Sequence, residues 1–155
     1  MSARSLAHAG FTLVREYPSS VAEVWAAFAE EDRKRDWFGH GEGRQRGGEW
    51  RFDFRVGGRD IAESRFHDGP VSRYVAVYTD IVEHERIVTT YDMWLDGTHI
   101  STSVASFEFE TVGRNTRLTH GEHGIHLDGF DLDGELRERG SAGLLDALGR
   151  SLARS

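Results

Sequence analysis

The sequence has no cysteine among its 155 residues. This absence excludes disulfide bonds, iron–sulfur clusters and zinc sites built from thiolates. Proline occurs only twice, and lysine occurs only once, at Lys34, so arginine carries nearly all of the positive charge. No apolar run approaches the roughly 18 residues of a membrane span, and the N-terminus lacks the apolar segment of a secretory signal. We therefore expect a cytoplasmic protein without membrane insertion.

The overall charge is negative. Nineteen basic residues stand against 26 acidic residues, which gives a net charge of −7. A chain this acidic has no overall field that attracts nucleic acid, so we expect no such partner. The length fits one domain, and we expect residues 1–155 to form it, with an ordered core over about residues 11–152.

Glycine and aromatic residues are abundant. The chain has 18 glycines and an aromatic content of 11%, which is typical of twisted strands and tight turns around bulky side chains. Period-two alternation predicts seven strands, six of them in one meander. These are residues 11–17, 48–55, 59–66, 71–82, 87–95, 100–111 and 116–123. A two-residue hairpin is predicted at Gly57-Gly58.

Helix signals occur at two places. Ser20 and Glu23 form a capping box, which predicts a helix beginning near Val21. The charged run 30–36 indicates a second short helix. Leucines recurring every four residues predict a long helix over about residues 136–152. Two glycines inside that helix, at positions 140 and 143, indicate either close packing on the sheet or room for a ligand.

The predicted fold is α+β. An antiparallel sheet of about seven strands curls, and its aromatic face needs a cover. The C-terminal helix is the only predicted element long enough to supply that cover, with one or two short helices after the first strand. The space between a curled sheet and one helix is a natural pocket.

Short stretches in a fixed order carry a resemblance that covers about residues 11–152. They are Tyr17-Pro18, Val24-Trp25, Trp37, Gly47–Arg51, Glu85–Val88, Thr116–Thr119, Glu122–Gly124, Leu127–Gly129, Arg139-Gly140 and Leu144–Leu148. The order of elements resembles the helix-grip fold of the START-like (SRPBCC) superfamily, which includes polyketide cyclases. The stretches resemble bacterial proteins similar to the C-terminal domain of the activator of the heat-shock-protein-90 ATPase.

The resemblance implies three functions, which stay open at this point. The first is binding of an apolar or aromatic small molecule between sheet and helix, without a cofactor. The second is an enzyme of the cyclase or dehydratase kind. The third is a co-chaperone-like protein-interaction module. An exposed strand edge would also allow a homodimer.

Ten side chains are the predicted lining of the cavity. Most are aromatic residues at strand spacing, which also suits a plain core, and tyrosines are favoured because a buried phenol needs a partner. The ten are Trp37, Phe38, Phe52, Phe54, Tyr78, Tyr91, Met93, His120, Glu122 and Phe130.

The segment His120-x-x-His123-x-x-His126 invites a metal site, but strand parity argues against it. His123 should point to the opposite face from His120, so we predict no metal site. Leu118, His120 and Glu122 should share the core face. Glu122 and His120 are then candidate proton-handling groups, unless Glu122 is paired with an arginine or opens to solvent.

The glycine-rich segment 39–48 lacks the ending of a phosphate-binding loop. We expect it to be a flexible loop over the cavity mouth. We expect the basic residues around it, Arg33, Lys34, Arg35, Arg44 and Arg46, to form a solvated face.

Overall fold

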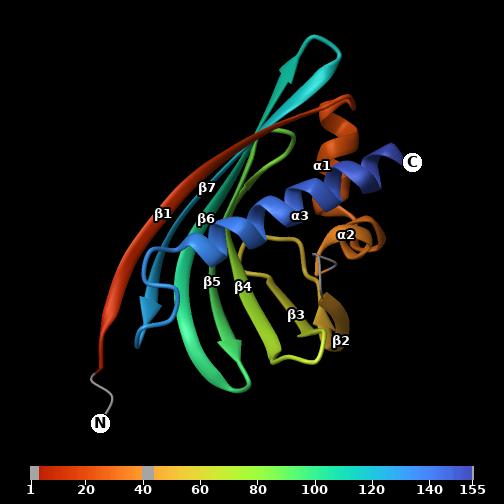
Figure 1. The fold of residues 1–155 in the computed structure, drawn as a ribbon. Coiled ribbons are helices and arrows are strands. Elements are labelled where there is room, and N and C mark those ends of the chain that lie inside the picture. Colours follow the sequence, from red (N-terminus) through yellow and green to blue (C-terminus); the bar gives the residue numbers. More distant parts are fainter. Residues whose placement is uncertain (1–3, 40–43, 155) are drawn as a thin grey trace.

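The computed structural model describes residues 4–39 and 44–154, and its seven strands form one antiparallel sheet. The elements are β1 (Leu6–Tyr17), α1 (Val21–Ala29), α2 (Glu31–Trp37), β2 (Arg44–Arg51), β3 (Arg59–Phe66), β4 (Val71–Val82), β5 (Arg86–Leu95), β6 (Thr98–Val112), β7 (Asn115–Leu127) and α3 (Glu135–Ala153). The strand order is β1-β7-β6-β5-β4-β3-β2, so β1 and β2 are the edges. The curved sheet wraps around α3, and α1 and α2 pack beside the C-terminal half of that helix (Figure 1). The predicted fold is confirmed.

The first helix begins where the capping box predicts. Ser20 is the N-cap residue of α1, and its side chain accepts a hydrogen bond of 3.2 Å from the backbone N–H of Glu23. The charged run after α1 forms α2, as expected. A helix of this charge is stable here because its inward face contains Trp37, which is buried against α1.

Two predictions near β2 are wrong. The strand ends at Arg51, so Phe52 and Phe54 do not continue its alternation, and their rings stack on each other with centroids 6.1 Å apart. The Gly57-Gly58 pair is not a two-residue hairpin, because residues 52–58 form a longer connection to β3. Gly58 is required there, since a Cβ atom would lie 2.1 Å from the carbonyl oxygen of Asp53.

The glycine-rich segment also differs from the expected loop. Its second half belongs to β2, which begins at Arg44 and pairs with β3. Residues 40–43, in the middle of the segment, lie outside the described part of the chain. Gly47 and Gly48 lie between the paired residues Arg46 and Trp50, where the register of β2 on β3 shifts, so the strand accommodates these glycines in an irregularity of the ladder.

The core lies between the concave face of the sheet and the helices. One cluster joins α1, α2 and the C-terminal half of α3 to the sheet, and its most buried members include Phe28, Leu118 and Leu148. A second, smaller cluster lies on β4, β5 and β6 around Tyr91 and Met93. Polar groups occupy the region between and beside the two clusters.

Gly140 and Gly143 of α3 are not there for close packing. A Cβ atom built on Gly140 or Gly143 would have no atom within 4 Å. The close-packing interpretation is therefore wrong, and the helix has space beside it at both positions. No helix within the described residues is both long and apolar enough to cross a membrane.

Candidate functional site

A cavity of about 40 Å³ lies between the concave face of the sheet and helices α1, α2 and α3. A water molecule needs roughly 10–15 Å³ of such volume, so the cavity as it stands has room for about three. Its lining is mostly aromatic and aliphatic. The lining residues are Phe28, Lys34, Trp37, Phe38, Tyr74, Tyr78, Ile87, Thr89, Phe107, His120, Ser141, Leu144 and Leu145.

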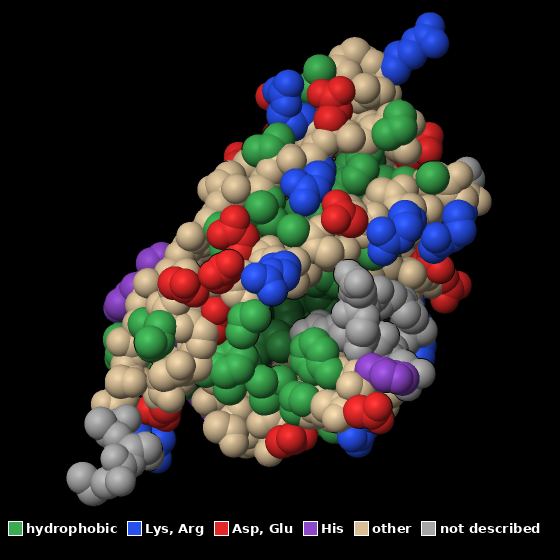
Figure 2. All heavy atoms as spheres, viewed as in Figure 1, with side chains coloured by type: hydrophobic (Ala, Val, Ile, Leu, Met, Phe, Trp, Pro, Cys, Tyr) green, Lys and Arg blue, Asp and Glu red, His purple; other side chains and the backbone are tan. Residues whose placement is uncertain are grey.

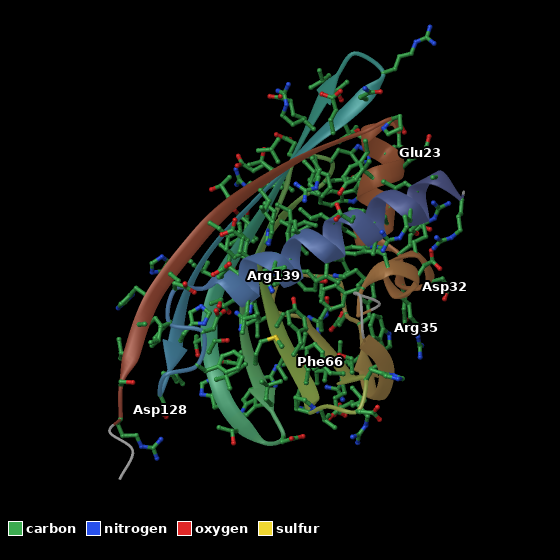
Figure 3. The ribbon with its side chains drawn as sticks, in the orientation of Figure 1. Glu23, Asp32, Arg35, Phe66, Asp128 and Arg139 are labelled. Atoms are coloured by element: carbon green, nitrogen blue, oxygen red, sulfur yellow. The ribbon has the colours of Figure 1, made fainter. Side chains whose placement is uncertain are left out.

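The face of the molecule beneath α3 is hollowed. Figure 2 shows hydrophobic side chains lining this hollow, with charged side chains around it. Arg139 on α3 and Phe66 at the end of β3 lie on opposite sides of the hollow (Figure 3). The concave face is therefore the place where the molecule offers apolar surface beneath its long helix.

The only lysine of the chain lies in the wall of the cavity. Lys34 is 6% exposed, and its Nζ atom lies 3.3 Å from Asp60 Oδ2 and 4.6 Å from the centroid of the Phe38 ring. The prediction of a solvated face is wrong for this residue, although its neighbours Arg33 and Arg35 are exposed. Helical spacing is the reason, because Lys34 and Trp37 are three residues apart and share the buried face of α2.

A tyrosine completes this polar group. The Tyr78 hydroxyl donates a hydrogen bond to Asp60 Oδ2, the oxygen that also faces Lys34. Burial, and next the negative charge of Asp60, raise the pKa of Tyr78, so its hydroxyl keeps its proton. We call Lys34, Asp60 and Tyr78 the lysine cluster.

A second polar group lies on β5, β6, β7 and the first turn of α3. The Tyr91 hydroxyl donates to Glu122 Oε2 at 2.7 Å, and Arg137 Nη1 lies 3.4 Å from the same oxygen. Arg137 also donates to the hydroxyl oxygens of Ser101 at 2.6 Å and Ser103 at 3.2 Å. We call these five residues the arginine cluster, in which the predicted cavity acid is neutralised by an arginine.

Arg137 is positioned by the start of α3. The Asp131 carboxylate accepts hydrogen bonds from the backbone N–H groups of Leu136 and Arg137, each at 3.0 Å. A carboxylate here also suits the partial positive charge at a helix N-terminus. Arg137 was not predicted as a site residue, because the leucine spacing of the helix does not indicate which strand residue an arginine in its first turn will face.

Burial shifts the pKa values of Glu122 and His120 in opposite directions. It raises the pKa of Glu122, while Arg137 and the hydrogen bond from Tyr91 lower it. It lowers the pKa of His120, whose Nδ1 atom lies 3.1 Å from the carbonyl oxygen of Ser106. Since a carbonyl only accepts, Nδ1 is the donor and Nε2 of the neutral ring is left as an acceptor, 3.8 Å from Glu122 Oε1.

Strand parity places the three histidines as predicted. Along β7, His120 and His126 are buried and His123 is exposed, with its ring nitrogen 3.4 Å from that of His8 on β1. The Nδ1 atom of His126 lies instead 3.7 Å from Asp131 Oδ2. Within residues 4–39 and 44–154, no three histidine or acidic side chains lie close enough together to hold a metal ion.

The predicted lining residues divide into two groups. Trp37, Phe38, Tyr78 and His120 line the cavity. The other six do not line it: Tyr91, Met93 and Phe130 belong to the second core cluster, Glu122 to the arginine cluster, and Phe52 and Phe54 to the connection after β2. That these six bind a ligand stays a prediction. Asp60 was not predicted as a site residue, because no motif distinguishes it from the other acidic residues.

A curved sheet that wraps around a C-terminal helix, with a cavity between them, defines the protein as a helix-grip protein. Comparison with known families gives the finer assignment. The chain belongs to the family of Activator of Hsp90 ATPase homolog 1-like proteins, whose model matches residues 18–153. No curated protein matches the chain.

Solved structures support the same fold over nearly the whole chain. Mll3558 from Rhizobium loti is 38% identical, with a TM-score of 0.84, over 95% of this chain and 99% of that one. An uncharacterized protein from Rhizobium leguminosarum is 33% identical, with a TM-score of 0.91, over 99% and 100%. CalU16 from Micromonospora echinospora is 18% identical, with a TM-score of 0.60, over 98% and 86%, which shows the fold alone.

Proposed function

We propose that the protein binds an apolar or aromatic small molecule between the sheet and α3. The observation that carries the proposal is the cavity itself, whose wall combines aromatic rings with a few inward polar groups. Such a combination is typical of small-molecule sites.

A bound ligand has to enlarge the cavity. An apolar cavity of about 150 Å³ admits benzene, and the present volume is about 40 Å³. Phe38 and Leu144 are half-buried members of the lining, as are Tyr74 and Phe107, so these side chains can move outward at the least cost in buried area.

Calorimetric titration with 2-methoxynaphthalene tests this proposal. The Ser141→Leu variant places a larger side chain in the cavity wall and should lose binding, because Ser141 is a buried lining residue. The matched control is Arg150→Leu, an exposed position on the same helix, and it should bind like the wild type. Absence of wild-type binding of both 2-methoxynaphthalene and its hydroxyl counterpart 2-naphthol, or binding that survives Ser141→Leu, contradicts the proposal.

Proton transfer to or from a bound ligand is a second candidate function. The observation that favours it is His120, a cavity-lining histidine whose Nε2 atom is an acceptor beside Glu122. The test is exchange of the acidic α-hydrogens of 2-tetralone in D2O. His120 would take the proton from carbon, and a deuteron from solvent would replace it on the enolate. His120→Gln should abolish any acceleration and Arg150→Leu should not; no acceleration by the wild type contradicts this candidate.

The protein-interaction function has less support in the described residues. The large apolar side chains that are exposed there are scattered over different elements, and single exposed apolar residues are normal. They are Leu6, Val14, Val56, Val104, Leu132 and Leu136.

A further inference from the structure

The two carboxylate oxygens of Asp60 have different surroundings. Oδ2 faces Lys34 Nζ and accepts the hydrogen bond of Tyr78. Oδ1 has no hydrogen-bond partner in the described part of the chain, although the side chain is only 7% exposed. A buried acceptor without a partner costs about 1–3 kcal/mol and is rare in folded proteins. Oδ1 therefore has capacity for a donor from outside the chain.

Lys34 has capacity to donate further hydrogen bonds, whereas Asp60 Oδ1 has capacity to accept one. An ammonium group carries three N–H donors, and the polar contact that the described residues show for it is Asp60 Oδ2. Its other neighbours are aromatic rings, with centroids at 4.6 Å for Phe38, 5.7 Å for Trp37 and 5.9 Å for Phe28. Lys34 and Tyr78 both line the cavity, and Asp60 lies behind them, joined to both through Oδ2. The cavity wall therefore holds a spare donor, and the carboxylate directly behind it holds a spare acceptor.

We propose that the lysine cluster recognises a hydroxyl group on an aromatic ligand. The hydroxyl donates its proton in a hydrogen bond to Asp60 Oδ1 and accepts one from Lys34 Nζ. This inference rests on the proposed function and names the ligand class within it, a neutral aromatic molecule with a phenolic hydroxyl.

The charges of Lys34 and Asp60 exclude two other ligand groups, a carboxylate and an ammonium. A ligand carboxylate would approach Lys34 but would also meet the carboxylate of Asp60, with no donor of its own for Oδ1. A ligand ammonium would satisfy Oδ1 but would meet the ammonium of Lys34. The Lys34–Asp60 pair sums to zero charge, so a neutral group that both donates and accepts leaves the buried charge balanced.

The rings around Lys34 explain why the hydroxyl should be aromatic. The ammonium already lies near the faces of several aromatic side chains, an arrangement that stabilises a cation. A ligand ring entering beside Phe38 and Trp37 extends that environment and buries apolar surface against the same wall. A phenol brings the ring and the hydroxyl together in one rigid group, so little conformational freedom is lost on binding.

The first test compares 2-naphthol with 2-methoxynaphthalene by calorimetric titration of the wild type at neutral pH. The methyl ether has the same ring system and cannot donate. We expect 2-naphthol to bind at least about tenfold more tightly, because a site built to pair a hydroxyl discriminates against the ligand that lacks it. Equal affinity overturns this inference and leaves the proposed function standing, with Oδ1 then paired with water. Binding of neither compound overturns both.

Variants then test whether Lys34 and Asp60 cause the preference for 2-naphthol over 2-methoxynaphthalene. The double variant Lys34→Met, Asp60→Leu removes both charges together, which is tolerated better than breaking a buried pair. We expect it to bind the two compounds equally, within about threefold. The matched control is Arg33→Met, an exposed position on the same helix, which should keep the preference. A preference for 2-naphthol that persists in the double variant overturns the inference.

A second measurement does not depend on the double variant folding. Because Lys34 is the only lysine, ¹⁵N-labelled lysine gives a single Nζ resonance in the NMR spectrum. Addition of 2-naphthol should shift this resonance, and 2-methoxynaphthalene should shift it less. A resonance that 2-naphthol leaves unmoved while calorimetry shows binding overturns the inference.

Discussion

Replacing Arg137 by methionine removes the cation that faces the buried carboxylate of Glu122. The side chains of Glu122 and Arg137 are 3% and 11% exposed, so solvent screens this pair little. Methionine keeps most of the apolar stem of arginine and deletes the donors to Glu122, Tyr91, Ser101 and Ser103. The variant therefore isolates the electrostatic role of Arg137 from its packing.

The expected cost at neutral pH is about 3–5 kcal/mol of unfolding free energy, the range for a buried ion pair that loses one partner. The cost should depend on pH. Burial holds the pKa of Glu122 above its ordinary value already in the wild type, and Arg137 opposes that rise. In the variant the pKa rises further. A raised carboxyl pKa gives stability that is full below the unfolded pKa, about 4.3, and is lost as the pH rises through the folded pKa.

The difference between variant and wild type should therefore be small near pH 4 and grow toward pH 7. Urea denaturation across this range measures it. The matched control is the double variant Glu122→Gln, Arg137→Met, which removes the charge as well as its partner, so it should recover most of the lost stability and lose the extra pH dependence. A cost below about 1 kcal/mol at pH 7, or no recovery in the double variant, refutes the reasoning.

Three further substitutions test the packing and the polar groups, each by chemical denaturation. Phe28→Ala should cost about 3–5 kcal/mol, because this fully buried ring packs on several other aromatic rings; a cost below about 1 kcal/mol would show that the ring is not central to the core. Tyr78→Phe should cost about 1–3 kcal/mol, because Asp60 loses a buried donor, and an unchanged midpoint contradicts this. Gly124→Ala should cost about 1–3 kcal/mol, because its Cβ atom would lie 2.7 Å from Ser103 Oγ; a neutral result would mean that Ser103 moves freely.

The fold could be predicted because its signals are local. The alternation of β4 and the capping box of α1 are properties of neighbouring residues, and both were placed correctly. The errors occur where tertiary contacts determine the conformation of the backbone. Residues 52–58 lie outside the strands although Phe52 and Phe54 alternate, and the Phe54 ring packs edge-on against Trp25 and Tyr78.

The polar groups of the site could be predicted only in part. Parity along β7 places His120 and Glu122 on one face, and they are both buried there. Their partners were not predictable, because Arg137 lies on the helix and Tyr91 on another strand, and only the packing of helix on sheet joins them to Glu122. Lys34 was misplaced because a charged run on a short helix usually faces solvent, and its partner Asp60 lies 26 residues further along.

The chain contains four tryptophans, and their indole N–H resonances report on the cavity directly. Trp37 lines the cavity, and its indole N–H donates to the carbonyl of Ala27 at 2.9 Å. Trp94 stacks on His99 and does not line the cavity. If a ligand binds between the sheet and α3, titration with 2-methoxynaphthalene shifts the Trp37 resonance and leaves that of Trp94 unmoved. No shift of Trp37 at saturation, or a larger shift of Trp94, would contradict binding between the sheet and α3.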